Sequence, residues 1–570
     1  MLARLRFILR PETIVCTLAG LLIVYLTVVP LFMLLYGSFS SSPPGVAGHF
    51  TLDNYASLFE RKEMIRSFYN SLVFSVGASL LAFLGGVYLA WVTERTNMPF
   101  KKAIYAAILV PIIVPGLLTT IGWIMLFSRR SGLINLIATR VLGFEQPLEL
   151  YNMAGMIWVL GSDQIPLAFL LLAASFRSMD PSLEEAAIIS GTGIVRTTFQ
   201  ITLRVLLPAI LSVWIITFVR AIENFEVPAL VGIPAGILVF ATEVYLATHK
   251  VPTDFGLAST FAIVYLVITA VGIFFYLKAT KVSERFTTIT GKGYRPVAFD
   301  LGAWRYPLAL TTLIFGLIVF IFPVLTIVWS SFLPFYMAPS SEALASLSFD
   351  NYKRLFSLPL IGRAFRNSLV LGISSSTIVM TLTAMMAWIV VRTQWRGRGT
   401  LDFLAFSPIA IPGLVLGIAI LWLYLTVPIP IYGTIWILLI AYVIKYLPYG
   451  MRACSSSMHQ IQKELEEASE MSGASWLYTF RRVLLPLLLP GFVAGWIYVI
   501  THSFRELSTS IMLYRSGTEV LSVVIFELWD AGQYPELSAL GMSLVVVLLA
   551  ISLLARWVAG KFSVQQSESG

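Results

Sequence analysis

Six ionisable side chains lie in apolar stretches of the sequence, where a charge is costly to bury and marks a transport pathway or a structural pair. They form three pairs whose members are 282 residues apart, and two of these pairs combine opposite charges. The pairs are Asp163 with Lys445, Arg220 with His502, and Glu223 with Arg505. If the paired positions face a common axis, the two oppositely charged pairs are predicted to be ion pairs between related halves of the protein.

These charges have three competing interpretations. A buried ion pair can hold two halves of a protein in register. The same pair can act as a gate that parts during a transport cycle, or its members can contact a transported solute. We favour a structural or gating role, because paired charges leave little net field for a substrate. We predict that Asp163 and Lys445 are coupled, so that substituting both differs from the sum of the single substitutions.

Two short acidic segments, Leu183–Gly191 and Leu465–Gly473, have the composition of docking helices. Acidic residues in a first turn suit the helix dipole, Asp180 is an N-cap candidate, and a glycine ends a helix sharply. A plain amphipathic surface helix does not require this pattern twice, so we predict that both segments bind a partner. The residues concerned are Glu184, Glu185, Ala186, Ala187 and Gly191 in the first segment and Glu466, Glu467, Ala468 and Gly473 in the second.

The sequence repeats itself at a constant offset. The stretch 70–73, Asn-Ser-Leu-Val, returns at 367–370, and Pro-Gly-Leu at 115–117 returns at 412–414, both 297 residues later. From Pro166, which matches Pro448, the offset is 282, so the first copy has fifteen extra residues before that point. Each copy is expected to hold six spans and therefore to enter the membrane in the same orientation, with a path along the axis between the copies.

The elements that position these residues must be membrane-spanning helices. Of the 570 residues, 58% are hydrophobic and 12% are charged, and the mean hydropathy is +0.84. The apolar blocks are about 20 residues long, the length that crosses a bilayer, and as helices they satisfy their own backbone hydrogen bonds in lipid. We predict twelve spans: a first repeat at residues 1–280 with its acidic loop at 180–208, a cytoplasmic linker at 281–303, and a second repeat at 304–562 with its loop at 462–490.

The distribution of positive charge predicts the orientation. Arg4, Arg6 and Arg10 precede the first span, and the linker is the longest basic connection, so the positive-inside rule places both termini and the linker in the cytoplasm. The formal net charge of +9 has the same explanation and gives no reason to expect a nucleic-acid partner. The first span is too long to be a cleavable signal peptide.

Several kinds of chemistry lack the residues that they need. Cys16 and Cys454 are far apart, and the four histidines share no metal-ligand spacing, so we expect no disulfide framework and no metal site. The stretch Gly291-Lys292-Gly293 lacks the earlier glycine and the hydroxyl residue of a phosphate-binding loop. No span gathers a nucleophile with a base or a metal, which argues against a membrane enzyme. We expect no cofactor on this chain.

The two acidic segments resemble the EAA loop of bacterial ABC importer permeases, in which Glu-Ala-Ala and a later glycine are followed by an aliphatic residue and Leu-Pro. The second segment fits with Ser469 in place of an alanine, and the first has Arg204 where the second has Pro486. The resemblance implies a MetI-like type I importer fold, all-α, with about twelve transmembrane helices in two parallel repeats related by a pseudo-two-fold axis. It also implies two copies of a cytoplasmic ABC ATPase subunit as partners, which use ATP and Mg²⁺.

The whole chain, roughly residues 1–565, is similar to the fused permeases of the ferric-iron group, and Asn224–Gly236 resembles a segment of its members. This resemblance implies a bacterial inner-membrane location, a periplasmic binding protein that delivers the solute, and ferric iron as that solute. The alternatives within the class are thiamine, aminoethylphosphonate, a polyamine or an oxyanion. The alternative from another class is an ion-coupled secondary transporter that uses Asp163, Glu223 or Glu506.

Overall fold

The computed structural model describes residues 11–60, 62–286 and 299–568. These residues form helices and contain no β-strand, only two isolated bridges. Among them, nine helices are long and apolar enough to cross a membrane, and three bent helix pairs raise the number to twelve if each pair is one span. This confirms the prediction of an all-α membrane protein with about twelve spans.

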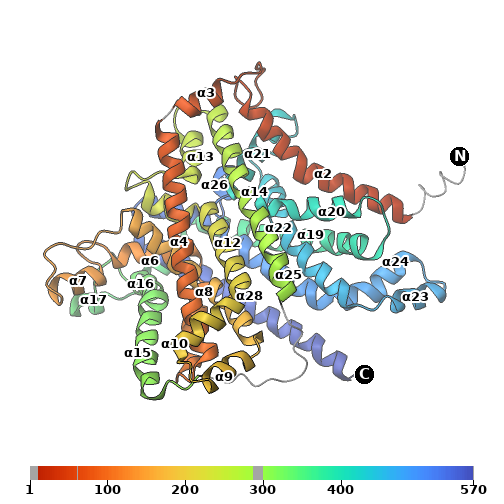
Figure 1. The fold of residues 1–570 in the computed structure, drawn as a ribbon. Coiled ribbons are helices and arrows are strands. Elements are labelled where there is room, and N and C mark those ends of the chain that lie inside the picture. Colours follow the sequence, from red (N-terminus) through yellow and green to blue (C-terminus); the bar gives the residue numbers. More distant parts are fainter. Residues whose placement is uncertain (1–10, 61, 287–298, 569–570) are drawn as a thin grey trace, which may run out of the picture.

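The first repeat runs through six spans, with four shorter α-helices and the π-helix η2 (Pro228–Gly232) between them (Figure 1). The spans are α2 (Pro11–Ser38), α4 (Lys62–Arg95), the bent pair α5 (Lys101–Ile113) and α6 (Gly116–Leu126), α8 (Met153–Ser178), the bent pair of Ile194–Val205 (α10, η1 and α11) and α12 (Leu207–Glu223), and α14 (Phe255–Phe286). The connecting helices are α3 (Asp53–Glu60), α7 (Leu133–Arg140), α9 (Ser182–Ile189) and α13 (Phe240–His249).

The second repeat has six spans in the same order. Its spans are Gly302–Ser331 (η3, α15, η4 and α16), α19 (Pro359–Arg392), the bent pair of Arg398–Ala410 (α20 and η5) and α21 (Gly413–Thr426), α22 (Ile435–Gln460), Trp476–Arg505 (α24, η6 and α25), and α28 (Tyr534–Glu568). The connecting helices are α17 (Ser341–Ala345), α18 (Asp350–Ser357), α23 (Glu464–Met471), α26 (Ser510–Leu513) and α27 (Leu521–Asp530). α22 and α23 begin and end 282 residues after α8 and α9, which agrees with the offset in the sequence.

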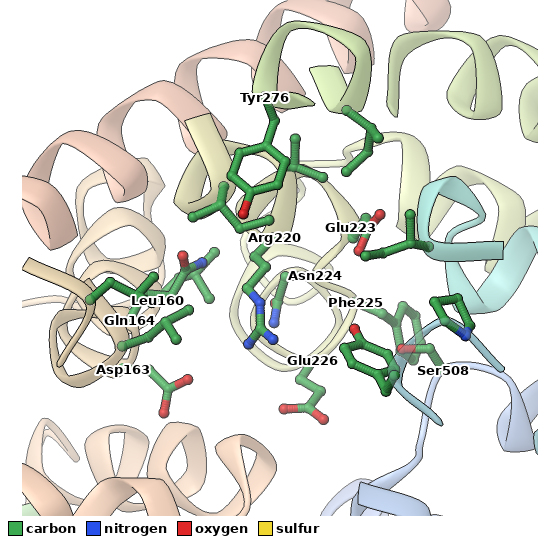
Figure 2. Close-up of a pocket in the computed structure, with 18 of the residues that line it drawn as sticks. Leu160, Asp163, Gln164, Arg220, Glu223, Asn224, Phe225, Glu226, Tyr276 and Ser508 are labelled. Atoms are coloured by element: carbon green, nitrogen blue, oxygen red, sulfur yellow. The ribbon is translucent and has the colours of Figure 1, made fainter. Parts of the chain in front are cut away.

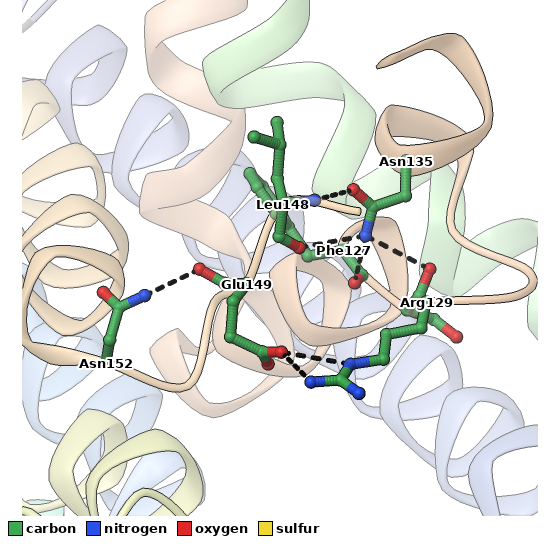
Figure 3. Close-up of polar contacts among 7 residues, drawn as sticks. Phe127, Arg129, Asn135, Leu148, Glu149 and Asn152 are labelled. Carbon is green, nitrogen blue, oxygen red and sulfur yellow. Dashed lines mark hydrogen bonds and ion pairs between the residues drawn. The ribbon is translucent and has the colours of Figure 1, made fainter. Parts of the chain in front are cut away.

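The extra residues of the first repeat lie between α6 and α8, where they form α7 and the loops beside it. Asn135 of α7 fastens this insertion: its amide nitrogen donates to the carbonyls of Phe127 and Leu148, at 2.7 and 3.0 Å, and its oxygen accepts from the Leu148 N–H (Figure 3). Arg129 and Glu149 form an ion pair next to it. The second repeat has no counterpart of α7 between α21 and α22, so the two repeats differ on this face.

The third span of each repeat is broken before a proline, Pro115 in the first repeat and Pro412 in the second. α5 and α6 meet at 107°, and the equivalent pair in the second repeat meets at 112°. Val114 and Ile411 are extended at these breaks, because the residue before a proline is disfavoured in the helical conformation. Each break places the N-terminus of a new helix, at Gly116 and at Gly413, in the interior of the protein.

The two repeats interlock through their first spans. α2 of the first repeat packs against α21 of the second, and α16 of the second packs against α6 of the first. Glycines allow both contacts: a Cβ at Gly37 would lie 2.4 Å from the Trp422 ring, and one at Gly122 would lie 2.4 Å from the Pro323 carbonyl oxygen. Close backbone approach of this kind is typical of helix contacts in lipid.

α2 begins and α28 ends towards the side of the molecule that carries α9 and α23 (Figure 1), as expected for an even number of spans. Arg4, Arg6, Arg10, the stretch 291–293 and residues 287–298 of the proposed linker lie outside the described residues.

Candidate functional site

A cavity of about 450 Å³ lies between the two repeats (Figure 2). Its wall in the first repeat comes from α8, α12, the segment after α12, and α14, and its wall in the second repeat comes from α20, η5, α22 and the segment after α25. Its charged and amide side chains are Asp163, Gln164, Arg220, Glu223, Asn224, Glu226 and Arg452. The cavity is therefore the place where the repeats face each other with polar groups.

The cavity reaches towards one side of the protein. Along α8 it extends from Leu160 to Leu171, about 16 Å at 1.5 Å per residue, in the direction of α9. At its other end Phe225 is buried, with its ring centroid 5.1 Å from that of Tyr245 and 6.1 Å from that of Phe526 in the second repeat. This aromatic contact between the repeats lies on the side away from α9 and α23.

The N-terminus of α6 faces two carboxylates. A Cβ at Gly116, the first residue of α6, would lie 2.8 Å from Glu226 Oε2 and 3.5 Å from Asp163 Oδ2. The Thr119 hydroxyl donates to Asp163 Oδ1 at 3.0 Å. Because a helix N-terminus carries unpaired N–H groups and partial positive charge, it stabilises both carboxylates.

The equivalent corner of the second repeat has the opposite chemistry. A Cβ at Gly413, the first residue of α21, would lie 2.8 Å from Lys445 Nζ and 2.8 Å from Ser508 Cβ. Lys445 donates to Glu506 Oε1 at 2.6 Å, and the Tyr446 hydroxyl donates to Glu506 Oε2 at 3.2 Å. Glu506 thus neutralises the lysine that stands where the first repeat has Asp163.

The predicted ion pairs between the repeats are wrong. Lys445 pairs with Glu506 of its own repeat rather than with Asp163. Arg505 donates to the backbone carbonyls of Ile112 and Val114, at 3.0 and 3.2 Å, rather than to Glu223. The reason is the break after α5, which leaves carbonyls without helical partners, and a guanidinium from the other repeat satisfies them.

The six predicted path residues divide into two groups. Those that line the cavity are Asp163, Arg220 and Glu223, and those outside its lining are Lys445, His502 and Arg505. Arg220 makes a hydrogen bond with the Tyr498 hydroxyl across the interface between the repeats. His502 stacks on the same tyrosine with 3.9 Å between the ring centroids. Only the first-repeat member of each predicted pair therefore faces the cavity.

The two acidic segments form the predicted short helices, α9 and α23. Each ends at a glycine with positive φ, +82° at Gly191 and +83° at Gly473, a conformation that glycine adopts without steric cost. Backbone hydrogen bonds from Gly191 to Ile188 and from Gly473 to Glu470 close the last turns. The Asp180 carboxylate accepts the Ser182 N–H at the start of α9. The predicted sharp stop after each helix is confirmed.

The two glutamates at the start of each helix differ in their surroundings. Glu184 and Glu466 are buried, whereas Glu185 is half-buried and Glu467 is exposed. Ala186 and Ala468 are exposed, and Ala187 is half-buried. Glu185 and Glu467, which stand directly before an alanine, are therefore at least partly accessible to solvent. Glu184 and Glu466, one residue earlier, are part of the protein interior.

An arginine at the end of α4 or α19 holds each buried glutamate. Arg95 lies 3.4 Å from Glu184 and donates to the Met179 carbonyl at the end of α8. Arg392 lies 2.6 Å from Glu466 and donates to the Ile461 carbonyl at the end of α22. Each arginine thus joins a short helix to the ends of two spans.

The Glu184 carboxyl has a perturbed pKa. Burial raises this pKa, and the hydrogen bond from the Thr202 hydroxyl and the charge of Arg95 oppose the rise. Because burial disfavours a charged carboxylate, both contacts favour the ionised form of Glu184.

Both α9 and α23 carry exposed apolar side chains, and α23 also exposes Glu464, Glu467 and Glu470. Ile189 is 86% exposed and Met471 is 89% exposed, and these two residues occupy equivalent positions. Leu183 and Leu465, also equivalent, are exposed as well. Exposed apolar side chains on a short helix at the end of a bundle are typical of a protein–protein contact.

Four residues of these sites were missed in the sequence. Glu226 and Gln164 line the cavity, and Arg95 and Arg392 hold the short helices. The arginines had a signal, because they are 297 residues apart and each ends a hydrophobic block. Glu226 had a weaker one, since it lies three residues after Glu223 and is matched by the uncharged Ser508.

Two helical repeats around a polar cavity, with matched short helices on one side, define a multi-pass membrane permease. The chain belongs to the family described as binding-protein-dependent transport system inner membrane component, which matches residues 82–289 and 379–563. Each matched segment lies almost entirely within one repeat, which confirms the internal duplication.

Relatives in this family differ in the solute that their names state. The chain is 27% identical to the ferric transport system permease protein FbpB of Actinobacillus pleuropneumoniae, over 89% of this chain and 73% of the relative. It is 28% identical to the spermidine/putrescine transport system permease protein PotC of Haemophilus influenzae, over 38% and 82%. It is 30% identical to a putative 2-aminoethylphosphonate transport system permease protein, PhnV, of Salmonella paratyphi A, over 33% and 69%.

Proposed function

We propose that this chain forms the translocation path of an ATP-driven importer of ferric iron in the bacterial inner membrane, with both termini in the cytoplasm. One observation carries the proposal: each repeat presents an equivalent short helix, α9 or α23, with exposed apolar side chains at matching positions, on the side towards which the cavity extends. Two copies of a cytoplasmic ATPase subunit fit this arrangement, one on each helix. ATP and Mg²⁺ act on those subunits, and this chain needs no cofactor.

The contacts of α9 and α23 suggest how ATP drives transport. Closure of the ATPase subunits moves both short helices, and Arg95 and Arg392 pass this movement to the ends of four spans. The cavity then closes on the cytoplasmic side, and the contact of Phe225 with Phe526 parts on the other side. A periplasmic binding protein docked there releases its solute into the opened path.

The choice of ferric iron rests on a relative that covers 89% of this chain and is named as a ferric transport permease. A polyamine and 2-aminoethylphosphonate are the next candidates, because relatives named for those solutes match a single repeat-sized segment. The unpaired carboxylates of the cavity support a positively charged solute.

Uptake of radiolabelled ferric iron by cells that lack the gene tests the proposal. The cells are complemented with the wild type, with Gly473→Asp at the end of α23, or with Gly433→Asp. Gly433 is the matched control, because it also has positive φ and open space around its Cβ position but lies in the loop between α21 and α22. We expect the wild type and the control to restore uptake and Gly473→Asp, although present in the membrane, to restore none.

The two parts of the proposal fail separately. If the wild type restores no iron uptake, ferric iron is the wrong solute, and the assay is repeated with radiolabelled spermidine. If Gly473→Asp transports as well as the wild type, the coupling role of α23 is wrong.

A further inference from the structure

We propose that the first repeat supplies a cation-transit site in the cavity, at which the carboxylates of Asp163, Glu223 and Glu226 and the amide oxygen of Gln164 contact a compact multivalent metal ion. This inference deepens the proposed function and rests on it for the direction of transport. The binding of the ion can be tested by itself.

The cavity wall contains oxygen atoms without partners. Gln164 is only 6% exposed, yet its Oε1 accepts no hydrogen bond, and Glu223 Oε1 accepts none either. Both residues line the cavity (Figure 2). Buried acceptors without protein partners are unfavourable, so these oxygens are stable only where water or a solute reaches them from the cavity.

The cations around the cavity are engaged elsewhere. Lys445 pairs with Glu506, Arg505 with two backbone carbonyls, Arg220 with the Tyr498 hydroxyl, and the Arg452 guanidinium lies 5.6 Å from the centre of the Phe406 ring. Within the described residues, none of the three carboxylates forms an ion pair. The cavity lining holds these three carboxylates against two guanidinium groups, Arg220 and Arg452, so the wall carries more negative than positive charge and favours a cation.

An oxyanion does not fit this wall. The natural place for an anion here is the N-terminus of α6, but Asp163 and Glu226 already occupy it. Carboxylate and amide oxygens instead suit hard cations. Both carboxylates lie next to Gly116, and this close placement suits a compact ion of high charge better than the spaced charges of a polyamine.

The site has the properties of a weak transit site rather than those of a tight metal-binding site. Across the described residues, no group of three or more His, Cys, Asp and Glu side chains is arranged to hold a metal ion. An ion here keeps much of its water and touches few protein ligands at a time. Conduction needs such weak contacts, because a tightly held ion does not leave.

Terbium(III), a hard trivalent ion, is the probe that we would use first. Its luminescence is enhanced by nearby tyrosines, and Tyr276 and Tyr449 line the cavity. The complete transporter, this chain with its ATPase subunits, is titrated in detergent as the wild type and as Glu226→Gln, Asp163→Asn and Glu342→Gln. Glu342 is the charge-matched control, because it is an exposed acid on α17. We expect saturable enhancement for the wild type and the control, and at least tenfold weaker binding for the other two variants.

Three results would overturn the proposal. They are no saturable terbium signal in the wild type, unchanged binding by Glu226→Gln and Asp163→Asn, or displacement of terbium by spermidine at concentrations where gallium(III) has no effect. Uptake of ferric iron, measured in parallel, separates this inference from the proposed function. If the variants lose terbium binding but the wild type takes up no iron, the cation site stands and the assignment of iron as the solute is wrong. If the wild type takes up iron but shows no saturable terbium binding, the cation site is wrong and the proposed function stands.

Discussion

At the scale of single residues, Lys445 forms an ion pair with Glu506 in place of the predicted pair with Asp163. Its ammonium lies 2.6 Å from Glu506 in the same repeat, and both side chains are largely buried. We expect Lys445→Gln and Glu506→Gln to be coupled by about 0.5–3 kcal/mol in a double-mutant cycle, because either single change leaves a buried charge without its partner. Denaturant unfolding of the purified protein in detergent measures this. The cycle of Lys445→Gln with Asp163→Asn is the comparison, and equal coupling there would contradict the pairing described above.

Gly191 and Gly193 allow a second test at this scale. Both lie in the loop after α9 but differ in backbone conformation, so substitution by alanine is expected to have different effects at the two positions. A Cβ at either position meets no atom within 4 Å, but φ is +82° at Gly191 and −67° at Gly193. We expect Gly191→Ala to destabilise the end of α9 by about 1–2 kcal/mol, the cost of a left-handed conformation for a residue with a Cβ, and to lower ATP-dependent uptake several-fold. Gly193→Ala should transport normally. Equal uptake by the two variants would mean that the turn after α9 is not needed for coupling.

The sequence predicted which residues correspond in the two repeats but not which side chains meet. A constant offset identifies Asp163 with Lys445 as equivalent positions, yet equivalence does not place them within reach of each other. Glu506 lies beside Arg505 in the chain, and only the turn of the backbone at the end of α25 brings it to Lys445. The acceptors of Arg505 are backbone carbonyls that become available at the break after α5. Backbone acceptors of this kind cannot be recognised from the types of the residues that carry them.

At the scale of elements, α9 and α23 make a prediction about partner binding. We expect Ile189→Glu and Met471→Glu to reduce the amount of ATPase subunit that copurifies with the permease, because each replaces an exposed apolar side chain, which docking would bury, with a charge. Ser182→Glu is the control, since Ser182 is exposed in the first turn of α9, where an acid suits the helix dipole. Full recovery of the ATPase subunits by both apolar-face variants would place the docking surface elsewhere.

Broken helices were only partly predictable. The breaks at Pro115 and Pro412 follow from the sequence, since a proline restricts the residue before it and both repeats carry the same stretch. The fifth span was not predictable in this way: α12 is set at 72° to the helix before it, whereas Trp476–Arg505 is a single span. The equivalent prolines Pro208 and Pro490 are present in both, and the second repeat has a further proline, Pro486, where the first has Arg204, so the prolines do not predict which of the two spans bends.

At the scale of the whole molecule, the crossed contacts of α2 with α21 and of α16 with α6 hold the repeats together. We expect the two repeats to copurify when they are expressed as separate chains divided within residues 287–298. Gly37→Leu with Gly122→Leu should abolish copurification, because each new side chain meets an atom that lies 2.4 Å from its Cβ. Gly399→Leu, on α20 with open space at its Cβ, is the control. Copurification of the doubly substituted halves would show that other contacts suffice.

The unequal corners at Gly116 and Gly413 have a consequence for how such a protein evolves. In a symmetric homodimer every substitution occurs twice, so a new acid near the axis appears together with its own copy. A tandem duplication within one gene removes that constraint, and the two copies are free to diverge. Asp163 and Glu226 on one side, with Lys445 and Ser508 on the other, form an arrangement that two identical subunits could not encode.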